Sequence, residues 1–200
     1  MSLQPDSAAA VPPSQAEPQE FSPEERQLLL TAAKEAIAAN IDRREIDLTA
    51  PTPHLAERRG AFTTLHIQNE LRGCVGYVFP THSLYRTVAE TAIAAAFHDT
   101  RFAPLQPDEL TALEIQISVL SPLQPIDAED VEVGRHGLVV TFGSRRGLLL
   151  PQVPVEHRWD RETFLAQTCL KAGLPPDAWQ RGATLEAFTA EIFGTSNFTW

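Results

Sequence analysis

The sequence lacks any apolar run approaching the ~20 residues that a membrane-spanning helix requires. Its first residues also lack the basic stretch followed by an apolar core that marks a secretory signal. Only two cysteines are present, Cys74 and Cys169, which is too few for a disulfide framework. These absences predict a protein of the reducing cytoplasm without a membrane partner.

Basic residues are scarce as well, since 16 Lys and Arg face 26 Asp and Glu and give a formal net charge of −10. Nucleic-acid-binding proteins need clustered positive charge, so this balance argues against a nucleic-acid partner. The one tight basic pair, Arg145-Arg146, lies between Gly143 and Gly147 and is predicted to be a solvated turn. No Cys or His residues have the short spacing of a zinc site, and the sequence indicates no cofactor.

What the chain does contain suits one globular domain, since 43% of its 200 residues are hydrophobic. Residues 1–20 are rich in Pro, Ala and Gln and are predicted to form a disordered tail. A single domain is expected over residues 21–195, followed by a short C-terminal tail over 196–200.

The predicted elements combine helices with hairpins. Ser22, Pro23 and Glu25 have the spacing of a capping box and predict a helix that begins there. Further helices are predicted over 83–98 and from Asp160 onward, the latter with Cys169 on its apolar face. Strands are predicted over 61–67, 71–79, 113–120, 137–142, 148–153 and 186–193, with turns at 69–70 and 143–147. The order shows no regular strand–helix–strand rhythm, so the predicted class is α+β, with antiparallel sheets and flanking helices.

The most informative stretch is Leu71-Arg72-Gly73-Cys74-Val75-Gly76. Strand alternation places Arg72, Cys74 and Gly76 on one face and leaves Leu71, Val75 and Tyr77 for the core. Because a nearby arginine favours the thiolate, Cys74 is a candidate nucleophile or soft-metal ligand that Arg72 would polarise and the two glycines would leave accessible. The alternative is that the glycines permit a tight strand crossing and Cys74 only fills space.

A nucleophilic mechanism would also need a base, and none of the histidines has a recognisable spacing to Cys74. His157 is the candidate, with Glu156 and Trp159 as neighbours, because loops after strands commonly carry function. In the alternative, His157 is a surface residue, Trp159 anchors the loop and Asp160 caps the next helix. Arg101 is a candidate anion ligand, although an ion pair with Asp99 is the favoured interpretation.

Five motifs occur in order, namely Gly60 to Leu65, Leu71 to Gly76, Asp99 to Leu105, Glu114 to Leu120, and Leu150 to Val153 followed by Trp159-Asp160. With these motifs the chain resembles the AMMECR family from about residue 25 to residue 193. The second motif is close to the hexapeptide that is the hallmark of the family, with Val75 where isoleucine is more frequent.

The resemblance implies an α+β protein of two unequal lobes, with the hexapeptide at a groove between them. It also implies partners, because prokaryotic members are often encoded with a Memo-type protein and a radical S-adenosylmethionine (SAM) enzyme, as the A component of a three-part system. Two hypotheses follow. The chain is either an enzyme or enzyme subunit that uses Cys74, Arg72 and His157, or a non-catalytic adaptor that docks a partner in the groove. The expected groove residues are Gly73, Gly76, Arg101, Glu156 and Trp159.

Overall fold

The structure, a computed structural model, describes residues 19–195. The tail predicted over 1–20 lies outside the described residues except for its last two positions, and the tail predicted over 196–200 lies wholly outside them. None of the helices in the described part combines the length and apolar character that a bilayer crossing needs.

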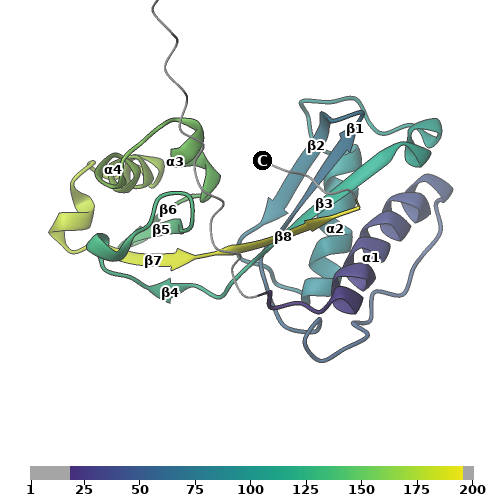
Figure 1. Cartoon of the computed structure of the whole chain (residues 1–200), viewed down its shortest axis with the longest axis horizontal. Coiled ribbons are helices and arrows are strands. Elements are labelled where there is room, and N and C mark those ends of the chain that lie inside the picture. Colours follow the sequence, from purple (N-terminus) through teal and green to yellow (C-terminus); the bar gives the residue numbers. More distant parts are fainter. Residues whose placement is uncertain (1–18, 196–200) are drawn as a thin grey trace, which may run out of the picture.

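The architecture is α+β, as predicted, with two antiparallel four-stranded sheets (Figure 1). Sheet A has the strand order β2-β1-β3-β8 and sheet B the order β4-β7-β5-β6. The strands are β1 (Ala61–Ile67), β2 (Glu70–Tyr77), β3 (Leu113–Leu120), β4 (Gln124–Pro125), β5 (Gly137–Phe142), β6 (Arg145–Leu149), β7 (Thr184–Phe188) and β8 (Ala190–Gly194). The helices are α1 (Pro23–Asp42), α2 (Leu84–Phe97), α3 (Gln152–Glu156) and α4 (Arg161–Lys171), with 3-10 turns at Pro107–Thr111, Ala128–Asp130 and Ala178–Arg181.

Helices α1 and α2 cover one face of sheet A and bury the larger core with it (Figure 1). The capping box of α1 forms as predicted, since Ser22 and Glu25 exchange side-chain and backbone hydrogen bonds. Helix α2 is rich in alanine, which lets its backbone approach the sheet closely. The four inward residues of β3, from Leu113 to Val119 at every second position, face this core as the alternation predicted.

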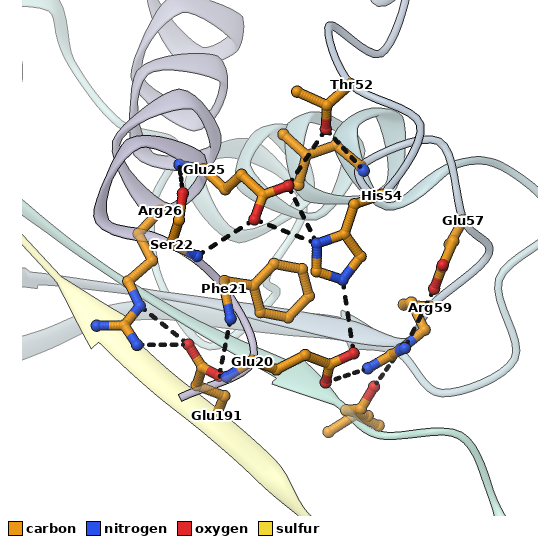
Figure 2. A network of polar contacts seen from close by, with 12 residues as sticks. Glu20, Phe21, Ser22, Glu25, Arg26, Thr52, His54, Glu57, Arg59 and Glu191 are labelled. Carbon is orange, nitrogen blue, oxygen red and sulfur yellow. Dashed lines mark hydrogen bonds and ion pairs between the residues drawn. The ribbon is translucent and has the colours of Figure 1, made fainter. Parts of the chain in front are cut away.

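A clasp of charged and aromatic side chains fastens the start of the described chain to this lobe (Figure 2). Glu20 forms ion pairs with Arg59 at 2.6 Å and with His54 at 3.5 Å. The His54 ring stacks on Phe21, with the ring centroids 4.6 Å apart, and its Nδ1 lies 3.0 Å from Glu25. We call Glu20, Phe21, Glu25, His54 and Arg59 the N-terminal clasp.

Sheet B and helix α4 enclose a second core. Asp160 accepts a hydrogen bond from the backbone N–H of Thr163 and is the predicted N-cap of α4. Cys169 is fully buried in this core, as predicted, and burial raises the pKa of its thiol.

The structure corrects three of the predicted elements. The strand expected over 148–153 ends at Leu149 because Pro151 is the N-cap of helix α3. Arg145-Arg146 belongs to strand β6 instead of a turn, and the hairpin loop is only Gly143-Ser144. The strand expected over 186–193 is two strands, β7 and β8, which belong to different sheets.

The last correction explains how the two sheets are joined. The chain passes from sheet A to sheet B after β3 and returns between β7 and β8 (Figure 1). A third core of buried side chains lies at this crossing and takes Leu120 from sheet A and Val139 and Phe188 from sheet B. The two sheets therefore share buried apolar surface.

Candidate functional site

The hexapeptide 71–76 lies within β2, and its side chains alternate as predicted from Gly73 to Gly76. A β-bulge opposite Leu65 and His66 breaks the alternation at Arg72, so Leu71 pairs with His66. A Cβ placed at Gly73 would lie 2.1 Å from the carbonyl oxygen of Ala95, so Gly73 faces helix α2. Cys74 therefore points to the opposite side of the sheet, where its Sγ accepts a hydrogen bond from the Thr64 hydroxyl at 3.3 Å. The expectation of a core position is correct for Val75 but wrong for Leu71 and Tyr77, which are 42% and 41% exposed.

Strand register extends this side of the sheet into ordered rows. Cys74 pairs with Thr64, which pairs in turn with Gln116 on β3. The next row runs from Gly76 through Phe62 to Ser118, and in the other direction His66 lies opposite Glu114. We call this side of sheet A the open face, because α1 and α2 pack on the other side. It is not exposed throughout, since Phe62 packs against the third core and Gln116 is only 4% exposed. It comprises Phe62, Thr64, His66, Cys74, Gly76, Glu114, Gln116 and Ser118.

The backbone of Cys74 is held from outside the sheet by the segment that follows α2. Its N–H donates to the Asp99 carboxylate at 2.9 Å, and its carbonyl oxygen accepts from Arg101 at 3.3 Å. Asp99 and Arg101 also form an ion pair at 2.7 Å, the interpretation that the sequence favoured for Arg101. Since β2 is an edge strand, this clamp satisfies backbone groups that no neighbouring strand could reach.

The electrostatics of this clamp follow from the same contacts. Hydrogen bonds from Arg101, together with the N–H of Cys74, hold the pKa of Asp99 far below its usual range although burial opposes them. The pair therefore stays ionised, and the positive charge of Arg101 remains beside the carbonyl of Cys74.

Arg72 forms contacts that the sequence did not predict. Its guanidinium binds the Glu109 carboxylate through two hydrogen bonds of 2.8 and 2.9 Å and donates a third to the carbonyl oxygen of Ala103. Bonding to Glu109 raises the pKa of Arg72. The guanidinium is therefore engaged by the 103–109 segment, and its effect on the Cys74 thiol stays a prediction.

The residues predicted around His157 lie in the other lobe. His157 and Glu156 are exposed at the end of α3, and the His157 ring stacks on Trp159, with the centroids 4.7 Å apart. Trp159 packs against the second core, as the anchoring alternative held. Within residues 19–195, no hydrogen bond, ion pair or ring contact links His157, Glu156 or Trp159 to the open face.

The two glycines of the hexapeptide also differ from the prediction. The space at Gly73 is filled by the backbone of α2, and a Cβ at Gly76 would lie 2.2 Å from the Phe62 ring. Both glycines serve the packing of sheet A, which agrees with the alternative of close approach. They do not clear a path to the thiol.

Sequence reasoning missed the polar residues that share the open face with Cys74. Glu114, Gln116 and Ser118 alternate with the apolar residues of β3, and this alternation was a signal that a second, polar face existed. Which strand lies beside β1 could not be derived from spacing, so Thr64 and Gln116 were not connected with the thiol.

Two further observations concern metal ligands and a cavity near this region. No three His, Cys, Asp or Glu side chains of the described part are grouped closely enough to hold a metal ion. A cavity of about 580 Å³ adjoins the end of β2 and is lined by residues 76–82 with Thr87 and Glu90. Arg146 of β6 lies above the Phe79 ring at its rim, 4.0 Å from the centroid, and so connects the second lobe to the end of β2.

Comparison with known proteins agrees with this architecture. The sequence model of the AMMECR1 family matches residues 30–193. A protein of Methanopyrus kandleri is 42% identical over 182 residues, which cover 85% of this chain and 88% of that protein. A protein of Thermococcus gammatolerans is 48% identical over 153 residues, which cover 70% and 75%. The crystal structure of an uncharacterized protein from Pyrococcus horikoshii is similar at a TM-score of 0.69 and 41% identity, covering 83% of this chain and 89% of that one.

Proposed function

The chain belongs to the AMMECR1 family, and from this premise we propose that it is the binding component of a three-part system, acting with a Memo-type protein and a radical SAM enzyme. Its contact surface in this proposal is the open face around Cys74. The observation that carries the proposal is the placement of the hexapeptide. Cys74 projects from the face opposite the two helices, while the Asp99–Arg101 clamp fixes its backbone.

A binding role suits these contacts better than covalent catalysis does. A cysteine nucleophile needs an adjacent base or a cation that stabilises the thiolate. In the described part of the chain the thiol is bonded to the hydroxyl of Thr64, while Arg72 is bonded to Glu109. A fixed strand with small polar side chains is a surface that a partner can meet with little loss of conformational entropy.

The decisive experiment is capture of the two proposed partners. We expect the purified chain to retain the Memo-type protein or the radical SAM enzyme from the same genome, and Cys74→Trp to reduce retention at least ~10-fold because it places a bulky ring on the open face. Leu170→Trp is the matched control, since Leu170 is exposed on α4 in the other lobe. Equal retention by both variants, or no retention by the unmodified chain, contradicts the proposal.

Thiol chemistry at Cys74 is the second candidate, and the Thr64–Cys74 hydrogen bond favours it. A hydroxyl that donates to sulfur stabilises negative charge there, as Arg101 near the Cys74 carbonyl also does. This candidate predicts that iodoacetamide modifies Cys74 faster than it modifies free cysteine at pH 7, and that Thr64→Val slows the reaction. Slow modification that Thr64→Val leaves unchanged would leave only the binding role.

A further inference from the structure

The second core opens at one end into a cavity of about 410 Å³. Its walls are residues 142–145, at the tip of the β5–β6 hairpin, and Leu174, Pro175, Ala178 and Arg181, which follow α4. None of these residues belongs to sheet A, so this cavity is distinct from the open face. Sites for small molecules have volumes of roughly 300–1,000 Å³, and this cavity lies within that range.

The walls of the cavity are mostly apolar. Leu174 and Ala178, each 6% exposed, are members of the second core. Phe142 is 50% exposed, although strand alternation places it on the same side of β5 as Leu138 and Val140 of that core. An apolar group in the cavity would cover the Phe142 ring and extend the core, and the removal of this surface from water favours binding.

A cationic group lies beside these apolar walls. Arg145 pairs with Phe142 across the hairpin, so both side chains project from the same face of sheet B. Its guanidinium donates a hydrogen bond of 2.6 Å to the carbonyl oxygen of Gly173, and it forms no ion pair with an acid among residues 19–195. The second guanidinium of the cavity, that of Arg181, is paired with Asp177. Arg145 therefore has N–H groups left for an anion, since a guanidinium carries several.

Together these features specify a ligand with an apolar body and an anionic head. A carboxylate suits the head, because its oxygens match the paired N–H groups of a guanidinium. We propose that the cavity binds a small monocarboxylate whose carboxylate bonds Arg145 and whose apolar body packs on Phe142, Leu174 and Ala178. A small ligand is favoured over a protein segment, because stable protein contacts bury far more surface than one cavity of this size offers. The site lies outside the proposed contact surface around Cys74, so either proposal can fail without the other.

The test is an NMR titration of the full chain with 3-phenylpropionate and with 3-phenylpropanamide, which has the same shape and no charge. We expect the backbone amide signals of Gly143 and Ser144 to shift with the carboxylate, which should bind at least ~10-fold more tightly than the amide. Arg145→Gln should remove this difference. Arg146→Gln is the matched control, because it removes the same charge from the next residue, whose side chain lies on the other face of β6 and pairs with Glu186. Equal weakening by the two substitutions, or no saturation by ~10 mM carboxylate, would overturn the proposal.

A second variant tests the apolar walls. Because Phe142 is exposed, Phe142→Ala should leave the fold intact and weaken binding of the carboxylate and of the amide by the same factor, about 3-fold or more. Leu170→Ala on α4 is the control, since Leu170 is also exposed and does not line the cavity. Unchanged binding by Phe142→Ala would contradict the proposal. A short peptide that ends in phenylalanine with a free carboxylate distinguishes the other source of this chemistry, and its binding at least ~10-fold more tightly than 3-phenylpropionate would refute the small ligand in favour of a partner's C-terminus.

Discussion

Gly73 is the position in the hexapeptide where a single methyl group would matter most. Its neighbour is the carbonyl oxygen of Ala95, a backbone atom in the last turn of α2 that cannot rotate away as a side chain can. At Gly76 the neighbour is the Phe62 ring, a half-buried side chain that can rotate. The same substitution therefore meets a rigid obstacle at one glycine and a movable one at the other.

We predict that Gly73→Ala destabilises the protein by about 1–3 kcal/mol or more, because sheet A and α2 must separate to admit the Cβ. Gly76→Ala should cost less, since the Phe62 ring can shift toward the open face. Urea unfolding of both variants at pH 7 measures the difference. A larger loss for Gly76→Ala would mean that the ring is held more firmly than the helix.

At this scale the sequence predicted directions better than partners. Alternation along β2 placed Cys74 on the correct face, because the period of a strand is local. The partner of Arg72 is Glu109, which lies in a 3-10 turn 37 positions away, and no local pattern connects the two. The ion pair of Arg72 with Glu109 was not predicted because the partner of Arg72 was sought among its neighbours in the sequence.

The edge of β2 shows how one short segment can stand in for a missing strand. Asp99 accepts from the Cys74 N–H and Arg101 donates to its carbonyl oxygen, as a neighbouring strand would do. Arg101 holds the pKa of Asp99 well below its ordinary value. The carboxylate consequently contributes stability that is fully present above the unfolded pKa of about 4 and is lost as pH falls below it.

We predict that Asp99→Asn lowers stability by about 1–3 kcal/mol at pH 7, toward the low end because Arg101 is largely exposed. The variant should also lose less stability than the unmodified chain between pH 5.5 and pH 3, since it has no carboxylate to protonate. Urea unfolding at the two pH values gives both quantities. Asp130→Asn, an exposed site, is the control, and equal acid sensitivity of Asp99→Asn and the unmodified chain would refute the clamp.

The N-terminal clasp depends on pH in the opposite sense (Figure 2). Burial lowers the pKa of His54, but its hydrogen bonds and charge contacts with Glu25 and Glu20 outweigh this and leave the pKa above its ordinary value. A raised pKa means that the clasp stabilises the fold below about pH 6.5 and that this contribution is lost as pH rises through the folded-state pKa.

Replacement of His54 by glutamine tests this sign. The unmodified chain should lose part of its urea stability between pH 6 and pH 8.5, whereas His54→Gln should lose less because it carries no titrating ring. His157→Gln is the matched control on the exposed end of α3 and should behave like the unmodified chain. A fall of equal size in all three proteins would show that His54 is not charged at pH 6.

Elements with a strong local signal were predicted well, and those set by contacts between lobes were not. Helix α1 was found from its capping box and β3 from its alternation, both of which are local. Helix α3 was mistaken for a strand because its apolar residues continue those of β6, and only Pro151 marks the change. The split between β7 and β8 was missed because Thr189, the residue between them, is not of a type that marks a turn. The break is set by the pairing of the two strands with different sheets.

The whole molecule consists of two sheets that are joined by crossing chains and by shared apolar packing. The Leu120 side chain of sheet A packs in a core whose other buried members, Val139 and Phe188, belong to sheet B. Because these side chains are almost fully buried, neither sheet can unfold without exposing surface of the other. The two lobes are therefore expected to unfold in one transition.

We predict that Leu120→Ala lowers the free energy of unfolding by about 2–5 kcal/mol and does so for both lobes. Trp159 and Trp179 pack in the second core, so their fluorescence in a Trp200→Phe background reports the second lobe alone. The urea midpoint of this fluorescence should fall together with the midpoint of far-UV circular dichroism, although Leu120 belongs to the sheet of the first lobe. Exposed Leu170→Ala on α4 is the control for a leucine truncation outside the shared core. If Leu120→Ala lowered the circular dichroism midpoint and left the tryptophan midpoint unchanged, the two lobes would unfold independently. The stability of the open face would then not depend on packing against sheet B.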